Sequence, residues 1–291
     1  MISVVVIGSG GQLGTDVVKA LESAAGYRVF PLSHKQVDCK DQRSVANTLG
    51  ELRPQVVVNC AAFVRVEECE DDPEEAVRVN GLGALYVART CAAIGALCGY
   101  ISTDYVFDGG KGEPYTERDE PRPINIYGTS KLVGEQFVHQ ACPEWFIVRM
   151  AGVFGKAGAQ AKRGNFVEAI LSKARTDGIA RVVDDVRMSP TYTHDAAQVL
   201  ERLIRERATG LFHVTNHGGC TWFEFAQTAI DIVGLRCKVE PISSSVYPTK
   251  AQRPKDSRLA SVRLDPTQRE LLRPWQEALR AYLEEKGYLS S

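Results

Sequence analysis

A glycine-rich turn near the N-terminus places the strongest constraint on the fold of this chain. Residues 3–7 form a short apolar run of strand length, and Gly8-Ser9-Gly10-Gly11-Gln12-Leu13-Gly14 follows it directly. Glycines at 8, 11 and 14 allow a tight turn, a close approach of the backbone to phosphate and close packing of the next helix. A strand, a glycine turn and a helix start in this order are typical of a dinucleotide-binding unit. The spacing is Gly-x-x-Gly-x-x-Gly, and an ordinary glycine-rich turn is the alternative.

The remainder of the first half alternates short β-branched runs with longer amphipathic stretches. This alternation is typical of repeated strand-helix-strand units, whose strands form a parallel sheet. We therefore expect an α/β fold with a Rossmann-type, doubly wound parallel sheet. The predicted strands cover residues 3–7, 28–32, 56–59, 97–102 and 146–149. Predicted helices begin near Leu13, Ser44, Pro73 and Tyr127.

The sequence changes character after Arg149, where a glycine-rich, basic stretch begins. We expect residues 1–150 to form an NAD(P)-binding domain and residues 151–291 to form mainly a smaller α+β cap that binds substrate. Residues 193–216 are expected to return to the first sheet, so that the two domains are interleaved. Further helices are predicted at 165–175, 194–207, 221–233 and 274–286, and one more strand at 211–215.

Composition argues against several classes of partner. The chain has 35 basic and 36 acidic side chains, so no excess of positive charge favours nucleic acid or an anionic membrane. No stretch has the length and hydropathy of a membrane helix, and the apolar N-terminal run lacks the features of a signal peptide. The eight cysteines show no close paired spacing. We therefore expect reduced thiols in a cytoplasmic protein, with metal binding as the weaker alternative.

The end of the second predicted strand bears on the choice of cofactor. In dinucleotide-binding domains an acidic residue at this place binds the adenosine ribose and repels a 2′-phosphate. Here the sequence reads Ser33-His34-Lys35, which favours NADPH, with NADH as the alternative. Lys35 is either a partner of the phosphate or a solvated surface residue. Asp38 is either an acceptor for the adenine amino group or a simple loop cap.

The most informative pair for chemistry is Tyr127 and Lys131. The two are four positions apart at a predicted helix start, so their side chains share one face. A phenol has a reference pKa near ~10, and a nearby ammonium group stabilises the phenolate. Lys131 would supply that charge and bind the nicotinamide ribose, while Tyr127 would protonate a carbonyl oxygen as hydride arrives. The same spacing occurs by chance on surface helices, so the pair needs support from other residues.

That support comes from Ser102 and Thr103, which end an apolar predicted strand upstream of the pair. In an open parallel sheet, ligands bind at the carboxyl ends of the strands. Thr103 is therefore a candidate hydrogen-bond donor to the developing alkoxide. A strand-end cap is the alternative role for Thr103.

With these motifs in chain order, the sequence resembles the extended short-chain dehydrogenases/reductases. Longer strings narrow the resemblance to the dTDP-4-dehydrorhamnose reductases, across nearly the whole chain. These strings are Gly11-Gln12-Leu13-Gly14, Asn59-Cys60-Ala61-Ala62, Ser102-Thr103-Asp104-Tyr105-Val106-Phe107-Asp108-Gly109, Asn125-Ile126-Tyr127-Gly128-Thr129-Ser130-Lys131, Ser189-Pro190-Thr191-Tyr192-Thr193 and Gln252-Arg253-Pro254.

The resemblance implies NAD(P)H-dependent reduction of the 4-keto group of a dTDP-linked 6-deoxy sugar, which gives dTDP-L-rhamnose for polysaccharide biosynthesis. The expected catalytic residues are Thr103, Tyr127 and Lys131. Residues expected at the cofactor are Gly8, Gly11, Gln12, Leu13, Asp38, Ala61, Ala62, Asn80, Ser102, Tyr127 and Lys131. Residues expected at the sugar nucleotide are Val66, Thr103, Asp104, Tyr105 and Arg253. The planar guanidinium of an arginine suits a diphosphate.

Two departures from the family pattern bear on the substrate. Members commonly have an aromatic residue, often tryptophan, beside the sugar, where this chain has Met150-Ala151-Gly152. A basic stretch at residues 159–163 follows. A homodimer bridged by magnesium is known in part of the family, and Asp16 is the nearest candidate for its acidic ligands.

Two other functions compete with the reductase. Another nucleotide-sugar reductase, epimerase or dehydratase would share the scaffold, and an epimerase or dehydratase would show no net consumption of NADPH. A regulatory subunit is the other alternative, because the β regulatory subunit of methionine adenosyltransferase is similar over the same motifs. One fold hosts several functions, so the fold cannot separate these. The intact set of Thr103, Tyr127 and Lys131 favours the enzyme.

Overall fold

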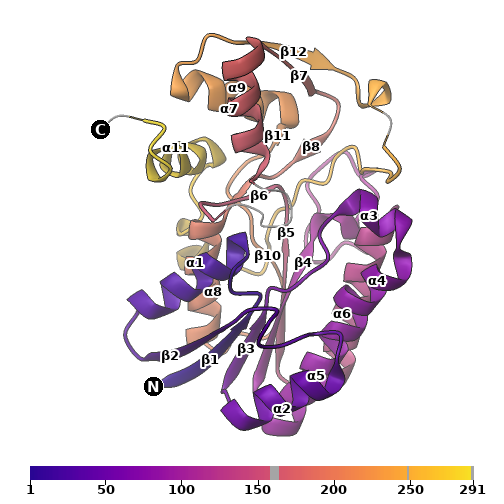
Figure 1. Ribbon diagram of the computed structural model, residues 1–291, viewed down its shortest axis with the longest axis vertical. Coiled ribbons are helices and arrows are strands. Elements are labelled where there is room, and N and C mark those ends of the chain that lie inside the picture. The colour runs from indigo at the N-terminus through magenta and orange to yellow at the C-terminus, as the bar shows by residue number, and fades with distance from the viewer. Residues whose placement is uncertain (158–163, 248, 290–291) are drawn as a thin grey trace.

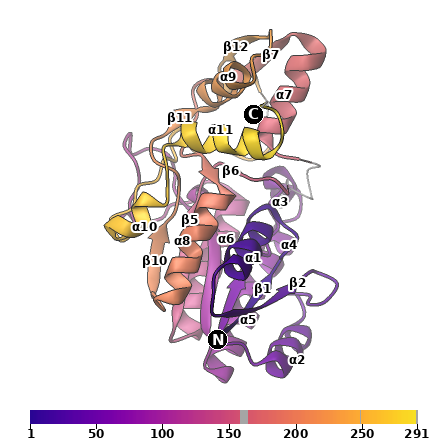
Figure 2. The same cartoon turned by 90° about the vertical axis from the view of Figure 1, so that its left-hand side faces the viewer.

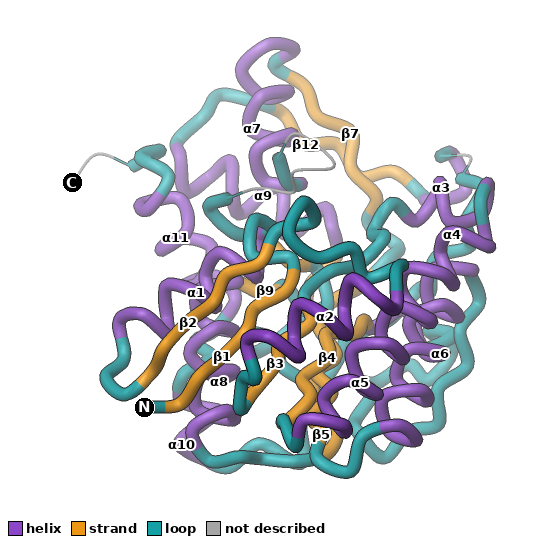
Figure 3. Tube along the Cα trace, turned by 60° about the horizontal axis from the view of Figure 1, so that its bottom comes forward, coloured by secondary structure: helices purple, strands orange, loops and turns teal. Residues whose placement is uncertain are grey.

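A parallel sheet forms the centre of the computed structural model, which describes residues 1–157, 164–247 and 249–289 (Figure 1). Six strands run in the order β10-β5-β4-β3-β1-β2, and every neighbouring pair is parallel. Figure 3 shows β2, β1, β3, β4 and β5 side by side. The strands are β1 (Ile2–Ile7), β2 (Tyr27–Leu32), β3 (Val56–Asn59), β4 (Leu97–Thr103), β5 (Trp145–Met150) and β10 (Gly210–His213). The strand order reverses beside β1, which confirms the predicted doubly wound fold.

Side chains of the central strands alternate between two apolar cores, because successive residues of a strand point to opposite faces. Val4 and Val6 belong to one core and Val5 and Ile7 to the other. The first core also contains residues of α1 (Gln12–Ser23) and α8 (Thr193–Arg205), and the second contains residues of α2 (Gln42–Leu52), α5 (Gly83–Ile94) and α6 (Ile126–Ala141). Both faces of the sheet are therefore covered by helices.

The helix predicted from Pro73 contains a local change of winding. It starts as α4 (Pro73–Val77), continues as the π-helical turn η1 (Arg78–Leu82) and runs on as α5. Single π-turns inside helices are frequent at functional sites. Here the turn contains the buried Asn80, whose backbone oxygen accepts a hydrogen bond from the Tyr100 hydroxyl at 2.8 Å.

A smaller cap lies at the end of the sheet domain where the strands terminate (Figure 2). Its apolar core joins residues of α7 (Phe166–Asp177), α9 (Trp222–Val233) and α11 (Trp275–Glu285). Short strand pairs complete it: β6 (Val153–Phe154) with β9 (Thr191–Tyr192), β7 (Ile179–Val183) with β12 (Lys238–Ile242), and β8 (Arg187–Met188) with β11 (Cys220–Thr221). Short connecting helices are α3 (Val66–Asp71), η2 (Asp104–Val106), η4 (Ser244–Val246) and α10 (Pro266–Glu270).

Several boundaries differ from the sequence-based expectation. α6 begins at Ile126, one residue early, because the Asn125 side chain caps it by accepting from the Gly128 backbone amide at 2.7 Å. β7 and β12 went unpredicted, since strands of five residues with exposed positions carry a weak pattern. The domain division at residue 150 stays a prediction, although β10 does pair with β5 of the first sheet. The basic stretch 159–163 lies outside the described residues.

The eight cysteines are all free thiols, and six of them are buried. Within residues 1–157, 164–247 and 249–289, no group of three or more His, Cys, Asp or Glu side chains could hold a metal ion. In the same ranges no helix combines the length and hydropathy needed to span a membrane.

Candidate active site

A cleft of about 1490 Å³ lies where the carboxyl ends of the parallel strands face the cap. It begins at the glycine turn, passes the ends of β3 and β4 and the start of α6, and reaches α7 and α9. The site residues predicted from sequence that line it are Gly8, Gly11, Gln12, Leu13, Asp38, Ala61, Ala62, Val66, Ser102, Thr103, Asp104, Tyr105, Tyr127, Lys131 and Arg253. One cleft therefore brings together all of the predicted residues except Asn80.

The glycine turn fits a pyrophosphate. Gly8 has φ +74°, and a Cβ there would lie 2.8 Å from the Ala61 amide nitrogen, so only glycine is free of strain. A Cβ on Gly14 would lie 2.3 Å from the Gly8 oxygen, so this glycine lets α1 approach the turn. The N-cap residue of α1 is Gly11, which has no side chain to cap the first amides of the helix. These amides, at the positive end of the helix dipole, are therefore free to bind an anion.

The adenosine end of the cleft is lined by His34, Asp38 and Lys40. Lys35 is exposed and is not part of the lining, so the cleft favours the surface interpretation of that residue. The Asp38 carboxylate accepts from the Lys40 backbone amide at 3.0 Å, which is the contact of a loop cap. The Lys40 ammonium group is paired with Glu75 at 2.9 Å.

Asn80 lies behind the lining instead of in it, with no exposed surface. Its side chain accepts from the Phe63 amide at 2.8 Å and donates to the Phe63 oxygen at 3.1 Å and the Ser130 hydroxyl at 2.9 Å. Asn80 thereby ties the loop after β3 to α6. Its contacts make it a support of the loop that carries Ala61 and Ala62.

Tyr127 and Lys131 are held at the cleft by close packing at the start of α6. A Cβ on Gly128 would lie 2.0 Å from the Tyr105 oxygen, so α6 rests directly on η2. Lys131 is 2% exposed, and its ammonium nitrogen lies 4.1 Å from the centre of the Tyr100 ring. A desolvated ammonium group over an aromatic face gains a cation–π interaction.

Burial changes the pKa of both side chains. It lowers the pKa of Lys131 to about 7, although the Glu135 carboxylate opposes the shift. Burial, with the charge of Asp104, raises the pKa of the Tyr127 phenol well above its usual value. Burial thus outweighs the lowering by a hydrogen bond with Thr103, and the lowering by Lys131 expected from the sequence is not among the causes of the shift. A protonated Tyr127 is the form that a proton donor requires.

Thr103 and Asp104 end β4 and begin η2. The Thr103 hydroxyl donates to the Asp104 carboxylate at 3.0 Å and accepts from the Tyr105 amide at 3.2 Å. The second contact is the predicted strand-end cap, so Thr103 caps η2 and also lines the cleft. Burial raises the pKa of Asp104 to about 6, although hydrogen bonds from Ser257 and Thr103 oppose the shift.

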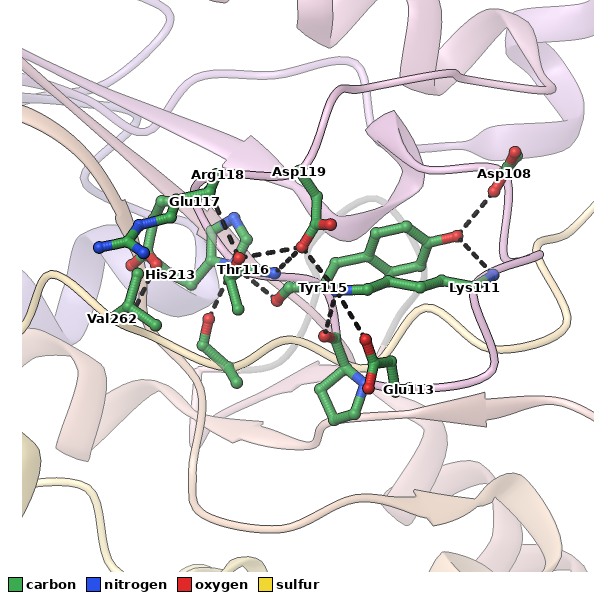
Figure 4. A network of polar contacts seen from close by, with 12 residues as sticks. Asp108, Lys111, Glu113, Tyr115, Thr116, Glu117, Arg118, Asp119, His213 and Val262 are labelled. Carbon is green, nitrogen blue, oxygen red and sulfur yellow. Dashed lines mark hydrogen bonds and ion pairs between the residues drawn. The ribbon is translucent and has the colours of Figure 1, made fainter.

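A polar network fixes the loop that follows this strand end (Figure 4). The Tyr115 hydroxyl donates to Asp108 at 2.6 Å and accepts from the Lys111 amide at 3.1 Å. The Asp119 carboxylate accepts from the Lys111 ammonium group at 2.8 Å. The Tyr115 ring stacks on Phe107 with 4.1 Å between centroids. The loop that carries Asp104 and Tyr105 into the cleft is therefore anchored a few residues downstream.

The segment before residue 257 forms another part of the cleft wall. Arg253 is paired with Glu67 at 2.6 Å, and one of its guanidinium nitrogens is buried with no hydrogen-bond partner among the described residues. The Gln252 oxygen accepts from the Asn125 side chain at 2.8 Å, which joins this segment to the start of α6. Arg253 also lies beside Tyr105, whose phenol pKa burial raises to about 12.

Gly152, where family members commonly have an aromatic residue, has a backbone conformation that strains any larger residue. It adopts φ +50°, and a Cβ there would lie 2.6 Å from the Met188 sulfur. Met188 itself lines the cleft, as do Phe166 and Trp222, whose rings lie 4.6 Å apart. Aromatic surface is thus present in the cap, but on different elements.

Sequence reasoning missed Met188, Phe166, Trp222 and Ser257. The first three lie in apolar patterns that core packing explains equally well, so no local signal marks them. Ser257 follows the Gln252-Arg253-Pro254 string closely, but its contact with Asp104 joins residues far apart in the chain.

Asp16 is a poor candidate for a magnesium ligand between subunits. It is 3% exposed, and its carboxylate accepts from the Thr193 hydroxyl at 2.5 Å and lies 3.3 Å from the Lys19 ammonium nitrogen. Asp16 therefore serves the packing of α1 on α8.

Comparison with known proteins agrees with this architecture. The family described as "RmlD substrate binding domain" matches residues 2–287. The spore coat polysaccharide biosynthesis protein SpsK of Bacillus subtilis is 40% identical over 99% of this chain and 99% of its own length. The dTDP-4-dehydrorhamnose reductase of Streptomyces griseus is 36% identical over 94% of this chain and 90% of its own length.

A solved structure gives the same result. The dTDP-4-dehydrorhamnose reductase of Bacillus anthracis, in complex with NADP, superposes with a TM-score of 0.89 at 34% identity, over 98% of this chain and 100% of its own. Sequence and structure together show that the chain belongs to the dTDP-4-dehydrorhamnose reductase (RmlD) family.

Proposed function

We propose that this protein reduces the 4-keto group of dTDP-4-dehydro-L-rhamnose with NADPH and forms dTDP-L-rhamnose. The observation that carries the proposal is the meeting of Thr103, Tyr127 and Lys131 in one cleft that starts at the glycine turn. Membership of the reductase family supports the same reaction.

Cofactor binding is assigned to the sheet side of the cleft. The turn at residues 8–14 and the first amides of α1 would hold the pyrophosphate, and Ala61, Ala62 and Ser102 would line the nicotinamide half. His34 and Lys40 are hydrogen-bond donors at the adenosine end, and they suit a 2′-phosphate better than a free ribose. The solved relative from Bacillus anthracis is a complex with NADP, which supports NADPH over NADH.

The chain's own residues then supply the proton and the electrostatic support. When bound, NADPH provides the hydride for the keto carbon. Tyr127 donates its phenolic proton to the keto oxygen, and Lys131 stabilises the phenolate that remains. Thr103 donates a hydrogen bond to the same oxygen as negative charge develops on it. Solvent then returns the proton to Tyr127.

The sugar nucleotide is assigned to the cap side. Arg253 offers a buried guanidinium nitrogen that has no partner in the part of the chain that the structure describes, which suits a diphosphate oxygen. Val66 and Tyr105 line the cleft on the sheet side of the sugar. Phe166 and Trp222 offer apolar rings at the cap end, where they would contact the sugar or the base. The cytoplasmic location and the homodimer stay predictions.

A second substrate needs a direct test because Gly152 stands where family members commonly have an aromatic residue, and the Met188 side chain lies beside it. The sugar-facing wall therefore differs in shape, and a related nucleotide-linked 4-keto-6-deoxy sugar is the second candidate. Epimeric sugars differ in the direction of their substituents, so this wall would discriminate between them.

The test is oxidation of NADPH, followed at the nicotinamide absorbance, with enzymatically generated dTDP-4-keto-6-deoxy-L-lyxo-hexose. We expect turnover with this sugar that is lost in Tyr127→Phe. The D-xylo epimer as substrate decides between the two candidates by the ratio of kcat/KM values. Tight NADPH binding without reduction of either sugar would contradict the proposal and favour a regulatory role.

A further inference from the structure

The carboxyl group of Asp104 is buried between two hydroxyls and has no cationic partner among the described residues. It is 4% exposed. One oxygen accepts from Thr103 at 3.0 Å and the other accepts from Ser257 at 2.5 Å. A buried carboxyl group without a cation favours the protonated form, because burial penalises the charge.

Ser257 reaches Asp104 from the cap side on a rigidly held backbone. Its amide donates to the Arg187 oxygen at 3.0 Å. Next to it, the Arg258 oxygen accepts from the Tyr115 amide at 2.7 Å, and the Ala260 amide donates to the Tyr115 oxygen at 2.8 Å. Tyr115 belongs to the anchored loop of Figure 4. The backbone contacts with Arg187 and with the Tyr115 loop therefore fix the position of the Ser257 hydroxyl.

The geometry creates a conflict for Thr103 if Asp104 is charged. A threonine hydroxyl has one proton to donate. In the structure Thr103 directs it at Asp104, and an ionised carboxylate would hold it in a charge-assisted hydrogen bond. Thr103 would then have no proton for the keto oxygen. A charged Asp104 also raises the pKa of Tyr127 and so weakens it as an acid.

We infer that Asp104 works as a neutral acid that shares its proton with Ser257, and that this pair frees the Thr103 hydroxyl for the substrate oxygen. In this state the Asp104 hydroxyl donates to Ser257, and Ser257 turns its own proton to the Arg187 oxygen, 3.5 Å away. Asp104 and Ser257 are positioning residues. Asp104 keeps its proton throughout, since the proton added to the sugar comes from Tyr127. The inference rests on the proposed reductase function.

The ionisable groups around Asp104 leave this state intact. The phenols of Tyr105 and Tyr127 face it, and burial raises the pKa of both, so they are neutral. Arg253 lies beside Tyr105 and is paired with Glu67. Lys131 lies one helical turn beyond Tyr127 on α6. Its own titration near pH 7 is a separate event that every variant with Lys131 retains.

The kinetic test compares the pH dependence of kcat in the wild type, Asp104→Asn and Ser257→Ala. For the wild type we expect kcat to fall as pH rises through the titration of Asp104, before the separate fall from Lys131. Asp104→Asn is neutral at every pH, so we expect it to lose the first fall and to keep kcat within about tenfold of the wild type. In Ser257→Ala we expect the first fall to occur at a different pH, because Asp104 loses the hydroxyl that shares its proton. An unchanged pH for this fall would contradict the pairing of Asp104 with Ser257.

Ser261→Ala is the matched control. Its hydroxyl also donates to a carboxylate at 2.5 Å, that of Glu117, but Ser261 does not line the active-site cleft. We expect unchanged pH dependence of kcat in this variant. A kcat loss of more than about a hundredfold in Asp104→Asn, with the first fall still present, would overturn the inference.

Infrared difference spectroscopy tests the protonation state without turnover. The carbonyl stretch of a protonated carboxyl group, taken as the wild-type spectrum minus that of Asp104→Asn with NADPH bound, should be present at pH 5 and should change frequency in Ser257→Ala. Its absence at pH 5 would show a charged Asp104 and would refute the inference. If the wild type fails to reduce the keto sugar while this band is present, the proposed function fails and the protonation state stands.

Discussion

The two walls of the cleft are built in different ways. The sheet wall consists of short consecutive strings: the turn at residues 8–14, the strand end at 102–104 and the helix start at 127–131. The cap wall takes single residues from separate elements: Phe166 from α7, Met188 from β8, Trp222 from α9 and Arg253 from the segment after η4. Proton donation and pyrophosphate binding depend on local geometry, so short strings can supply them. The wall that meets the sugar nucleotide exists only after the chain has folded.

The strongest test of the sheet wall is Tyr127→Phe. Removal of the proton donor should lower kcat by ~10²- to 10⁴-fold. The ring of Phe would keep the edge-to-face contact with Tyr105, at 6.0 Å between centroids, so NADPH affinity should stay nearly unchanged. Steady-state rates and nicotinamide fluorescence measure the two quantities. Tyr86→Phe, on α5 outside the cleft lining, is the control. Retained kcat in Tyr127→Phe would show that another group supplies the proton.

The cost of burying Lys131 should appear in the pH dependence of stability. Its pKa is about 7 in the folded protein, whereas a solvated lysine in the unfolded chain keeps its ordinary pKa of 10.5. Between these values the unfolded state binds more protons, so stability gains as pH rises from 7 to 10.5. Lys131→Met lacks this gain. We expect the unfolding free energy of the wild type to improve relative to Lys131→Met by up to ~4 kcal/mol over this window. Urea titrations at a series of pH values measure the unfolding free energy of both proteins. If the two free energies changed in parallel with pH, Lys131 would be solvated in the folded state.

Alanine variants of two glycines distinguish an effect on cofactor binding from an effect on folding. Gly8→Ala should lower the free energy of unfolding by ~1–3 kcal/mol, because alanine is strained at the positive φ of Gly8. The new Cβ would also press against the Ala61 amide. We expect NADPH affinity to fall by ~10-fold or more, because the turn must shift. Gly95→Ala is the matched control, since Gly95 also has a positive φ, +70°, but nothing within 4 Å of the added Cβ. Calorimetric titration with NADPH should show a normal affinity in that control. Equal affinity in both variants would contradict the assigned role of the turn.

The same difference between the walls explains what the sequence could predict. The parallel sheet followed from apolar strands such as Val56–Asn59, and Tyr127 and Lys131 followed from their spacing and from the strand end at Thr103. Asn80 was expected at the cofactor, but its π-turn places it behind the lining, and a π-turn has no clear sequence signal. Ser257 depends on a contact across 153 positions of the chain. Periodicity and spacing describe neighbours in sequence, so such contacts stay hidden from them.

The smallest effect is expected on the cap wall, in Trp222→Leu. Leucine keeps the contact with the apolar core of the cap and removes the ring that lies 4.6 Å from Phe166 in the cleft. Loss of one aromatic contact is worth ~1 kcal/mol, so KM for the sugar nucleotide should rise by ~3- to 5-fold while NADPH affinity stays the same. Trp145→Leu, in β5 and outside the cleft lining, controls for a general loss of stability. If Trp222→Leu changed the NADPH affinity and left KM for the sugar nucleotide unchanged, the cofactor would lie against the cap. That result would contradict the assignment of the sugar nucleotide to the cap wall.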